Sequence, residues 1–542
     1  MAELTIVFRL RFAVALAATI CIFLAFSAVR AEATGTRGEY IVQMKPGTSP
    51  AAGKRLVRRL GGRVTSPTLR VINGFGAALD RRALRRLRRQ RGVKAVTRNR
   101  GMRTSATDTS GGYACPTTDA TTVPAKSAQG AVDYDAPVTS AIKTLDQPFL
   151  KAIRADAAWS RATGRGVGVA VIDTGIAGDV PDLQTPGGAS RVIASAVTNP
   201  CARDANDQYG HGTHVAGLIA GNGLAYGNVL RGRYMGVAPR ANLVSVKVSD
   251  DDGNTTVLDV IYGIQFAVDH KATYGIRVVN LSLSSVTAES YLSDPLDAAV
   301  ESAWFSGLVV VAAAGNEGAT NDGVTFAPAN DPWVITAGAL DDKGTFSRLD
   351  DALAPWSSRG LTQDGVRKPE VLAPGAGLVS TLAPNSDFAR TCSSCVTEGG
   401  RYFRAGGTSM AAAVVSGAAA LLLEEHPDWT PAQVKGALTA KLVDVPGVGG
   451  VIDVAAALDA TSAFSTSLTP NSLVDPGSGL IDWNRASFRR ASFRDAGGSP
   501  LSASWSRASF RCDCGFTSSG EVDPSRVSFR RVSFRKTTDF GG

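Results

Sequence analysis

The sequence predicts an α/β fold with a central parallel sheet, preceded by a small α+β domain. Between residues 150 and 460, short apolar strands alternate with helical patterns, as in GVAVIDTG at 168–175 and LVVVAAAGN at 308–316. Strands without polar alternation are buried on both faces, and alternation with helices is typical of a parallel sheet that helices cover on both sides. Residues 38–103 show the order strand, helix, helix, strand, which predicts a separate small domain.

The charge of the chain is unevenly distributed. Its 542 residues exceed the size of one compact core, and its net charge of +9 would suggest an anionic partner if it were evenly spread. Residues 54–103 hold 17 Lys and Arg against one acid, residues 481–542 hold 11 against 6, and residues 104–480 hold 24 against 38. The basic excess belongs to the flanks, so no nucleic-acid partner is expected.

The N-terminus has the pattern of a secretory signal peptide. Arg9 and Arg11 precede an apolar run at 12–29, and small residues occupy the cleavage positions at 29–31. An uncleaved anchor is the alternative, because the run is near the length that spans a bilayer. A new composition follows at once, so we predict a signal peptide at 1–31, a secreted, extracellular protein and no stable membrane anchor.

The cysteines favour disulfides. Of seven, one lies in the predicted signal peptide, which leaves an even six in an exported chain. The spacing Cys392-x-x-Cys395 alone would also fit half of a zinc site, but no second pair or nearby histidine completes one. The sequence leaves the pairing open among Cys115, Cys201, Cys392, Cys395, Cys512 and Cys514.

Two segments lack the pattern of a globular core. Residues 104–149 are rich in Thr, Ser, Ala and Gly without periodicity, which predicts a linker. Residues 461–542 form a tail with five copies of the pentad R-[AV]-S-F-R. Ala or Val and Phe of one copy would share a strand face, so we expect short amphipathic strands in the tail.

Four polar residues stand where the predicted strands end or the helices begin. Asp173 ends one strand, Asn316 follows another, His211 begins a helical pattern, and Ser409 precedes an apolar helical run. Each alone has an ordinary explanation as a cap or turn residue. The carboxyl ends of parallel strands meet at one edge of the sheet, which would bring all four together. A serine with a base, an acid and an amide donor predicts acyl transfer.

These residues lie in motifs that resemble the subtilisin-like serine proteases. The motifs are DTG at 173–175, HGTHVAG at 211–217, AAAGNEG at 312–318 and GTSMA at 407–411, in the family's order Asp, His, Ser. The resemblance covers residues 150–460 and implies a three-layer subtilisin-like catalytic domain. It implies a serine endopeptidase that acts on proteins or peptides and needs no cofactor for its chemistry.

The resemblance also assigns roles to residues. Ser409 would be the nucleophile, His211 rather than His214 the base, Asp173 its orienting acid, and Asn316 an oxyanion donor. Asp182 matches one calcium ligand of the family, so structural calcium could bind there. Substrate-binding residues would be Ser282, Leu283 and Ser284 of an edge strand, and Ala313, Ala314 and Gly315 of a pocket wall.

The basic unit at 38–103 resembles the family's inhibitory propeptide through its pattern of elements alone. It would be an intramolecular inhibitor and chaperone of a zymogen, cut away within about 98–115. Its charge of 17 − 1 = +16 over 54–103 and the 24 − 38 = −14 of 104–480 would attract each other. The basic helix at 81–91 is expected to turn its charges toward acids of the catalytic domain.

Two positions depart from the family pattern. Ala413 stands where the family has a proline four residues after the nucleophile, which we expect to soften the placement of Ser409. Ser284 stands where a glycine usually follows Ser-Leu, and it could crowd a substrate side chain. The loop TFAPANDP at 325–332 resembles the family's pocket-forming loop and predicts a cis bond at Ala327-Pro328.

Other functions fit the sequence less well. An α/β-hydrolase esterase needs G-x-S-x-G and the order Ser, Asp, His, and both are missing. The glycines at 164–175 precede a strand instead of following it, which misplaces the phosphate loop of a dinucleotide-binding domain. The alternative from another class is a catalytically inactive secreted binding or adhesion protein that uses the tail repeats.

Overall fold

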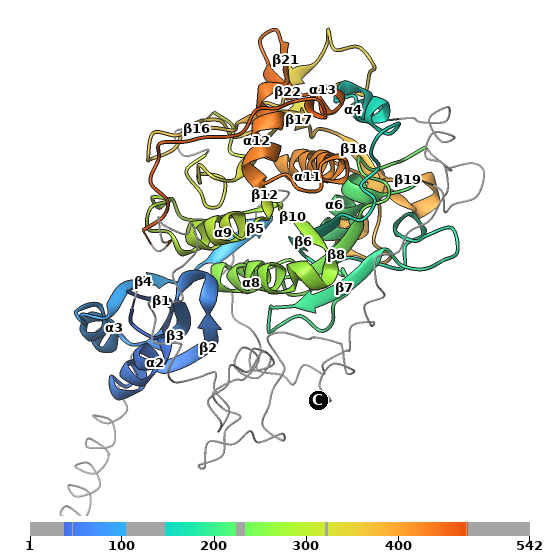
Figure 1. The fold of residues 1–542 in the computed structure, drawn as a ribbon. Coiled ribbons are helices and arrows are strands. Elements are labelled where there is room, and N and C mark those ends of the chain that lie inside the picture. The colour runs from blue at the N-terminus through green and yellow to red at the C-terminus, as the bar shows by residue number, and fades with distance from the viewer. Residues whose placement is uncertain are drawn as a thin grey trace, which may run out of the picture.

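A small N-terminal unit and a larger unit with a central sheet make up the computed structural model (Figure 1). The structure describes residues 37–45, 47–104, 147–223, 233–319, 324–472 and 474. The predicted signal peptide, most of the predicted linker and the tail repeats lie outside these residues.

The central sheet confirms the predicted parallel architecture. Its spatial order is β21-β22-β17-β13-β12-β10-β6-β8-β7, and β14 (Ala352–Leu353) pairs with β13. Neighbouring strands from β22 to β7 are parallel, whereas β21 is antiparallel at the edge. The strands are β6 (Gly168–Asp173), β7 (Val192–Val197), β8 (Asn242–Lys247), β10 (Ile276–Leu281), β12 (Val309–Ala313), β13 (Ile335–Asp341), β17 (Val371–Pro374), β21 (Leu442–Val445) and β22 (Gly449–Ile452).

Helices cover both faces of the central sheet (Figure 1). In β6, Val169 and Val171 belong to the apolar cluster that includes α6 and α11, whereas Ala170 and Ile172 belong to the cluster that includes α8 and α9. This alternation of period two produces the three layers. The long helices are α6 (His211–Ala220), α8 (Val257–Tyr274), α9 (Pro295–Phe305), α11 (Thr408–Glu425) and α12 (Pro431–Ala440).

Helix α11 is a core helix. Its 18 residues are long and apolar enough to cross a membrane, but 89% of them are buried inside the fold. No other helix in the described part of the chain meets that criterion. Ala413 lies fully buried inside this unbroken helix, so the missing proline does not prevent the helix from starting at Thr408.

Local sequence signals set the ends of the helices. Thr256 and Asp259 form a capping box at the start of α8, and Gly275 ends that helix in the left-handed region at φ 60°. Asp294 caps α9 by accepting a hydrogen bond of 2.6 Å from the backbone N–H of Leu296.

The N-terminal unit is an antiparallel sheet in the order β2-β3-β1-β4, with α2 and α3 on one face. The sequence prediction missed β2 and β3 between the helices. β2 contains a proline and β3 two glycines, and these residues are disfavoured in strands, which weakens the sequence signal of both. The elements are β1 (Gly38–Met44), α2 (Pro50–Arg59), β2 (Arg63–Leu69), β3 (Gly74–Leu79), α3 (Arg81–Arg88) and β4 (Val93–Arg98).

The other face of this sheet packs on α8 and α9 of the larger unit (Figure 1). Ile41 and Leu69 join the apolar cluster that contains Leu258 of α8. The backbone N–H of Val71 donates to Gln265 Oε1 at 2.9 Å. The shared apolar cluster and this hydrogen bond therefore join the two units.

Helix α3 contradicts the expectation that its arginines face acids of the larger unit. Ala83 and Leu87 of α3 are buried against the sheet of their own unit, together with Val57 of α2. That apolar stripe fixes the orientation of the helix, so its exposed arginines lie on the side opposite the buried stripe. Helix α3 itself lies on the face of its sheet away from the larger unit (Figure 1).

Shorter elements complete the fold. They are η1 (Arg70–Ile72), α4 (Pro148–Ala152), α5 (Ala155–Ala158), η3 (Pro181–Leu183), β15 (Gly360–Leu361), β16 (Arg367–Lys368), β18 (Leu378–Thr381), α10 (Asp387–Thr391), η4 (Ser393–Cys395), β19 (Val396–Thr397), η5 (Glu398–Gly400), β20 (Tyr402–Ala405) and α13 (Val454–Ala457).

Candidate active site

Asp173 and His211 form a buried pair at the carboxyl edge of the sheet. Asp173 ends β6, His211 begins α6, and Asp173 Oδ1 lies 2.6 Å from His211 Nδ1. The backbone N–H of Thr174 also donates to Asp173 Oδ1 at 2.7 Å. Burial alone would lower the pKa of His211, but the charge and hydrogen bond of Asp173 outweigh it, so that pKa is raised.

A second carboxylate, which sequence reasoning missed, supports the start of α6. Asp207 is buried and accepts hydrogen bonds from Thr174 Oγ1, the backbone of Gly210, and the backbone and hydroxyl of Thr213, at 2.6 to 2.8 Å. Its charge also favours the protonated form of His211. The sequence signal that could have identified this residue is an acid four residues before His211.

Ser409 is bound to the neighbouring strand. Its hydroxyl donates to the carbonyl of Ser282 at 3.2 Å, and the Ser282 hydroxyl donates to the carbonyl of Ser409 at 3.1 Å. Nε2 of His211 is buried and has no hydrogen-bond partner among the described residues. No hydrogen bond therefore joins the Asp173–His211 pair to Ser409 in this structure.

Thr408 fixes the orientation of the Asn316 amide. Its backbone N–H and its hydroxyl both donate to Asn316 Oδ1 at 3.0 Å, and the hydroxyl accepts from the backbone N–H of Gly315 at 3.0 Å. An amide held by its oxygen presents its NH₂ group elsewhere as a donor. This role of Thr408 was not predicted from the sequence, although the residue directly precedes the candidate nucleophile.

A strand of the chain itself lies where substrate was expected. β5 (Gly101–Thr104) pairs antiparallel with β11 (Leu283–Ser285) on one side and with β9 (Thr255–Thr256) on the other. The register places Arg103 opposite Ser284 and Thr104 opposite Leu283. Two of the three predicted edge-strand residues thus pair with β5, and the third, Ser282, contacts Ser409.

The predicted pocket wall ends β12. Ala313, Ala314 and Gly315 are buried, and Gly315 has a φ of 102°, which favours glycine. The Ala327-Pro328 bond is cis, as expected, and the carbonyl of Ala327 accepts from the backbone N–H of Ser285 at 2.7 Å. The structure brings this loop to the edge strand.

The surroundings of Asp182 give little support to a calcium site. Its carboxylate accepts a hydrogen bond from the Tyr402 hydroxyl, and its carbonyl accepts one of 2.8 Å from the buried Arg191 guanidinium. Donors surround this residue, whereas calcium requires a cage of oxygen acceptors. No group of three acids, histidines or cysteines in the described ranges could hold a metal ion, so calcium at Asp182 stays a prediction.

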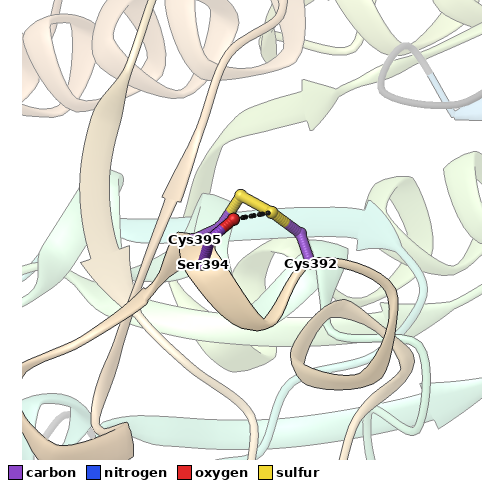
Figure 2. Close-up of a disulfide and its surroundings, with 3 residues drawn as sticks. All are labelled: Cys392, Ser394 and Cys395. Carbon is purple, nitrogen blue, oxygen red and sulfur yellow. Dashed lines mark hydrogen bonds between the residues drawn. A yellow bond between two sulfur atoms is a disulfide. The ribbon is translucent and has the colours of Figure 1, made fainter.

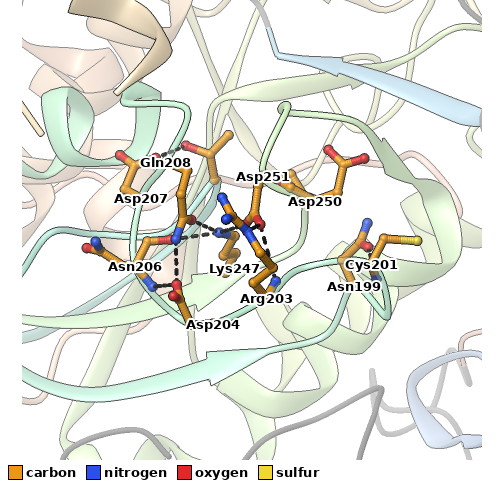
Figure 3. Close-up of polar contacts among 12 residues, drawn as sticks. Asn199, Cys201, Arg203, Asp204, Asn206, Asp207, Gln208, Lys247, Asp250 and Asp251 are labelled. Atoms are coloured by element: carbon orange, nitrogen blue, oxygen red, sulfur yellow. Dashed lines mark hydrogen bonds and ion pairs between the residues drawn. The ribbon is translucent and has the colours of Figure 1, made fainter. Parts of the chain in front are cut away.

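A buried lysine joins the loop before His211 to the loop before β9 (Figure 3). Lys247 ends β8 and donates to the carbonyl of Asn206 at 2.7 Å, to Asp251 Oδ1 at 2.8 Å and to Gln208 Oε1. Burial alone would raise the pKa of Asp251, but Lys247 and Arg203 lower it. The Lys247 ammonium group therefore links the loop that precedes His211 to the loop that precedes β9.

The disulfide Cys392–Cys395 closes the turn that follows α10 (Figure 2). Because both sulfur atoms are in the disulfide, this pair is not half of a zinc site in this structure. Phe388 of α10 packs its ring edge-to-face against His211, with 6.0 Å between ring centroids. His214, the alternative base, has Nε2 3.0 Å from the carbonyl of Phe403, and burial lowers its pKa to about 4.

Comparisons with known proteins agree with this geometry. A model of the subtilase family matches residues 164–465. The chain is 40% identical to serine protease AprX of Bacillus subtilis over 278 residues, 50% of this chain and 60% of AprX. It is 33% identical to subtilisin E of the same species over 429 residues, 78% of this chain and 90% of subtilisin E.

Solved structures give the same result. Fervidolysin from Fervidobacterium pennivorans, described as a keratinolytic enzyme related to subtilisin, matches with a TM-score of 0.56 and 25% identity. The match covers 79% of this chain and 62% of that one. The chain thus spans less than two thirds of both AprX and fervidolysin.

Proposed function

The chain belongs to the subtilase family of serine endopeptidases, and from this premise we propose that it is a secreted protease made as a self-processing zymogen. The observation that carries the proposal is β5, which lies as a substrate-like strand between β11 and β9. Peptides that bind by strand addition receive their affinity from main-chain hydrogen bonds, and these two strands supply them.

We propose that Asp173, His211 and Ser409 act as a catalytic triad. Asp173 holds the proton on Nδ1, which leaves Nε2 as the base. Ser409 gives its proton to Nε2 as its oxygen bonds to the substrate carbonyl carbon. His211 then protonates the leaving amine, and water cleaves the resulting ester by the same route. Asn316 Nδ2 and the Ser409 backbone N–H would stabilise the oxyanion.

Substrate binding would also release the nucleophile. The Ser282 carbonyl, which now accepts from the Ser409 hydroxyl, directly precedes β11, the strand that would pair with an incoming peptide. A substrate N–H that donates to this carbonyl would displace the Ser409 hydroxyl. The hydroxyl could then donate to His211 Nε2, which has no hydrogen-bond partner among the described residues. Apo sites often gain such bonds only in the substrate complex.

The register of β5 defines the bond that we propose is cut first. Arg103 pairs with Ser284 and Thr104 with Leu283, so the described register ends one position before Ser282. Since Ser282 contacts Ser409, we propose cleavage of the Ser105–Ala106 bond. This bond lies within the expected window of about 98–115, and the N-terminal unit would then inhibit the enzyme as its propeptide.

Labelling with a fluorophosphonate probe tests the activity. The chain should be labelled, and Ser409→Ala should not be labelled and should stay uncut. N-terminal sequencing of the processed chain should begin at Ala106. An unlabelled but folded wild-type chain would favour the inactive binding protein instead, and a mature N-terminus elsewhere would refute the register argument alone.

A further inference from the structure

The N-terminal unit has a strongly basic surface that the proposed activity does not use. We define the outer arginine face as the exposed residues Arg81, Arg82, Arg85 and Arg86 of α3, with Arg55 and Arg59 of the neighbouring helix α2. Both helices lie on the side of the sheet away from α8 and α9 (Figure 1). None of these six arginines has an ion-pair partner within the described ranges.

The charges of this face are not neutralised by ion pairs among the residues that the structure describes. Arg81 and Arg85, and likewise Arg82 and Arg86, are four residues apart on α3, a spacing at which like charges destabilise a helix. The only acid of residues 54–103 is Asp80, and it caps α3 by accepting from the Ala83 backbone N–H at 2.7 Å. An anion bound at this face would therefore reduce the repulsion among these arginines.

The contacts between the two units leave the face available. The described ion pairs that cross the interface are Arg70–Asp269 and Arg100–Glu289, and both lie on the inner side of the N-terminal sheet. The described ion pairs between the two units are thus formed by arginines outside α2 and α3.

We propose that the outer arginine face binds the surface of an anionic phospholipid bilayer. Two adjacent helices present guanidinium groups that pair with phosphate oxygens. Clusters of four to eight basic residues are attracted to anionic bilayers. The apolar run at 12–29 ends close before Gly38, the first residue of β1. Until the predicted signal peptide is removed, the residues between would hold the N-terminal unit within about 30 Å of the bilayer, which favours a membrane over a nucleic acid as the occupant.

The binding would be reversible, and the proposed self-processing would end it for the catalytic unit. Residues 106–542 hold 35 basic against 44 acidic residues, so this unit has a net negative charge and would not be retained by an anionic bilayer once it is separated. This consequence rests on the proposed function, whereas the binding of the precursor does not.

Vesicle co-sedimentation of the Ser409→Ala chain from residue 32 onward tests the proposal without requiring activity. The protein should sediment with vesicles of phosphatidylglycerol and phosphatidylcholine, should not sediment with phosphatidylcholine alone, and should be released by salt. Each arginine near such a surface contributes about a fivefold gain. The triple variant Arg82→Gln/Arg85→Gln/Arg86→Gln should therefore bind roughly 100-fold more weakly.

A matched control removes the same charge elsewhere. Arg203, Arg367 and Arg404 are exposed on the larger unit, and their triple Gln variant should bind as the parent does. Equal binding to both kinds of vesicle, unchanged binding of the α3 variant when circular dichroism shows it folded, or equal weakening of the control would overturn the proposal. Tighter binding of this face to duplex DNA at the same salt concentration would also overturn it.

Discussion

Four buried acids beside α9 should make the folded protein less stable as the pH rises. They are Asp294, Asp297 and Glu301 of α9 and its cap, and Asp331 from the loop that follows the cis Ala327-Pro328 bond. Burial raises the pKa of Asp294 and of Asp331 from 3.8 to about 7. Burial and the neighbouring Asp294 raise the pKa of Asp297 as well.

The direction follows from proton linkage. At neutral pH the unfolded chain has lost these protons, whereas the folded chain still binds them, so stability is present below about pH 4 and is lost as the pH rises through about 7. For Asp294, a gap of about three pKa units corresponds to about 4 kcal/mol. Because these acids repel one another when they are ionised, the effect of each depends on the others, and we expect about 2–4 kcal/mol from removing this one carboxylate.

Asp294→Asn isolates this effect, because asparagine caps a helix as well as aspartate does. Denaturant unfolding in the Ser409→Ala background, which prevents self-digestion, measures stability from about pH 5 to about pH 8. Relative to its parent, the variant should gain about 2–3 kcal/mol between the two ends of that range. The exposed Asp428→Asn should gain nothing. Parallel pH profiles for Asp294→Asn and its parent would refute the reasoning.

Three further predictions concern catalysis. Ser409→Ala and His211→Ala should each lower kcat by several orders of magnitude, while the double variant should be scarcely worse, because the pair acts as one unit; additive losses in a peptide-hydrolysis assay would separate the two residues. Asn316→Ala should cost about 10²–10³ in kcat with little change in KM. Thr408→Val should lower kcat about tenfold, because one of two bonds that orient the Asn316 amide is lost; an unchanged kcat would show that the backbone bond suffices.

The catalytic unit was predictable because its signals are local. All-apolar strands and helical patterns predicted the layers, and strand ends located Asp173, Asn316 and the start of α6 at one edge. β2 and β3 were missed because proline, glycine and polar residues hide a strand whose stability comes from tertiary packing. The orientation of α3 was mispredicted because net charge gives no direction, whereas the buried Ala83 and Leu87 do.

The supporting residues were harder to predict than the reacting ones. Lys247 follows an apolar strand pattern, but its partners Asn206 and Asp251 lie on separate loops that only the fold brings together. The bond between the Ser409 hydroxyl and the Ser282 carbonyl likewise depends on how α11 meets the strand. Sequence patterns predict the helix or strand on which a side chain lies, but they do not predict its rotamer or its hydrogen-bond partner.

The narrow groove between β11 and β9 has a consequence for the choice of substrates. β5 shows that the groove takes a chain in extended form, paired on both edges through its backbone. A helix or a sheet strand within a folded target must first detach and expose its own backbone, at a cost set by local opening of that target. If the proposed function holds, cleavage rates should therefore rank folded proteins by the free energy of opening a few residues, and native chains would differ from damaged ones as substrates through that opening free energy more than through residue identity.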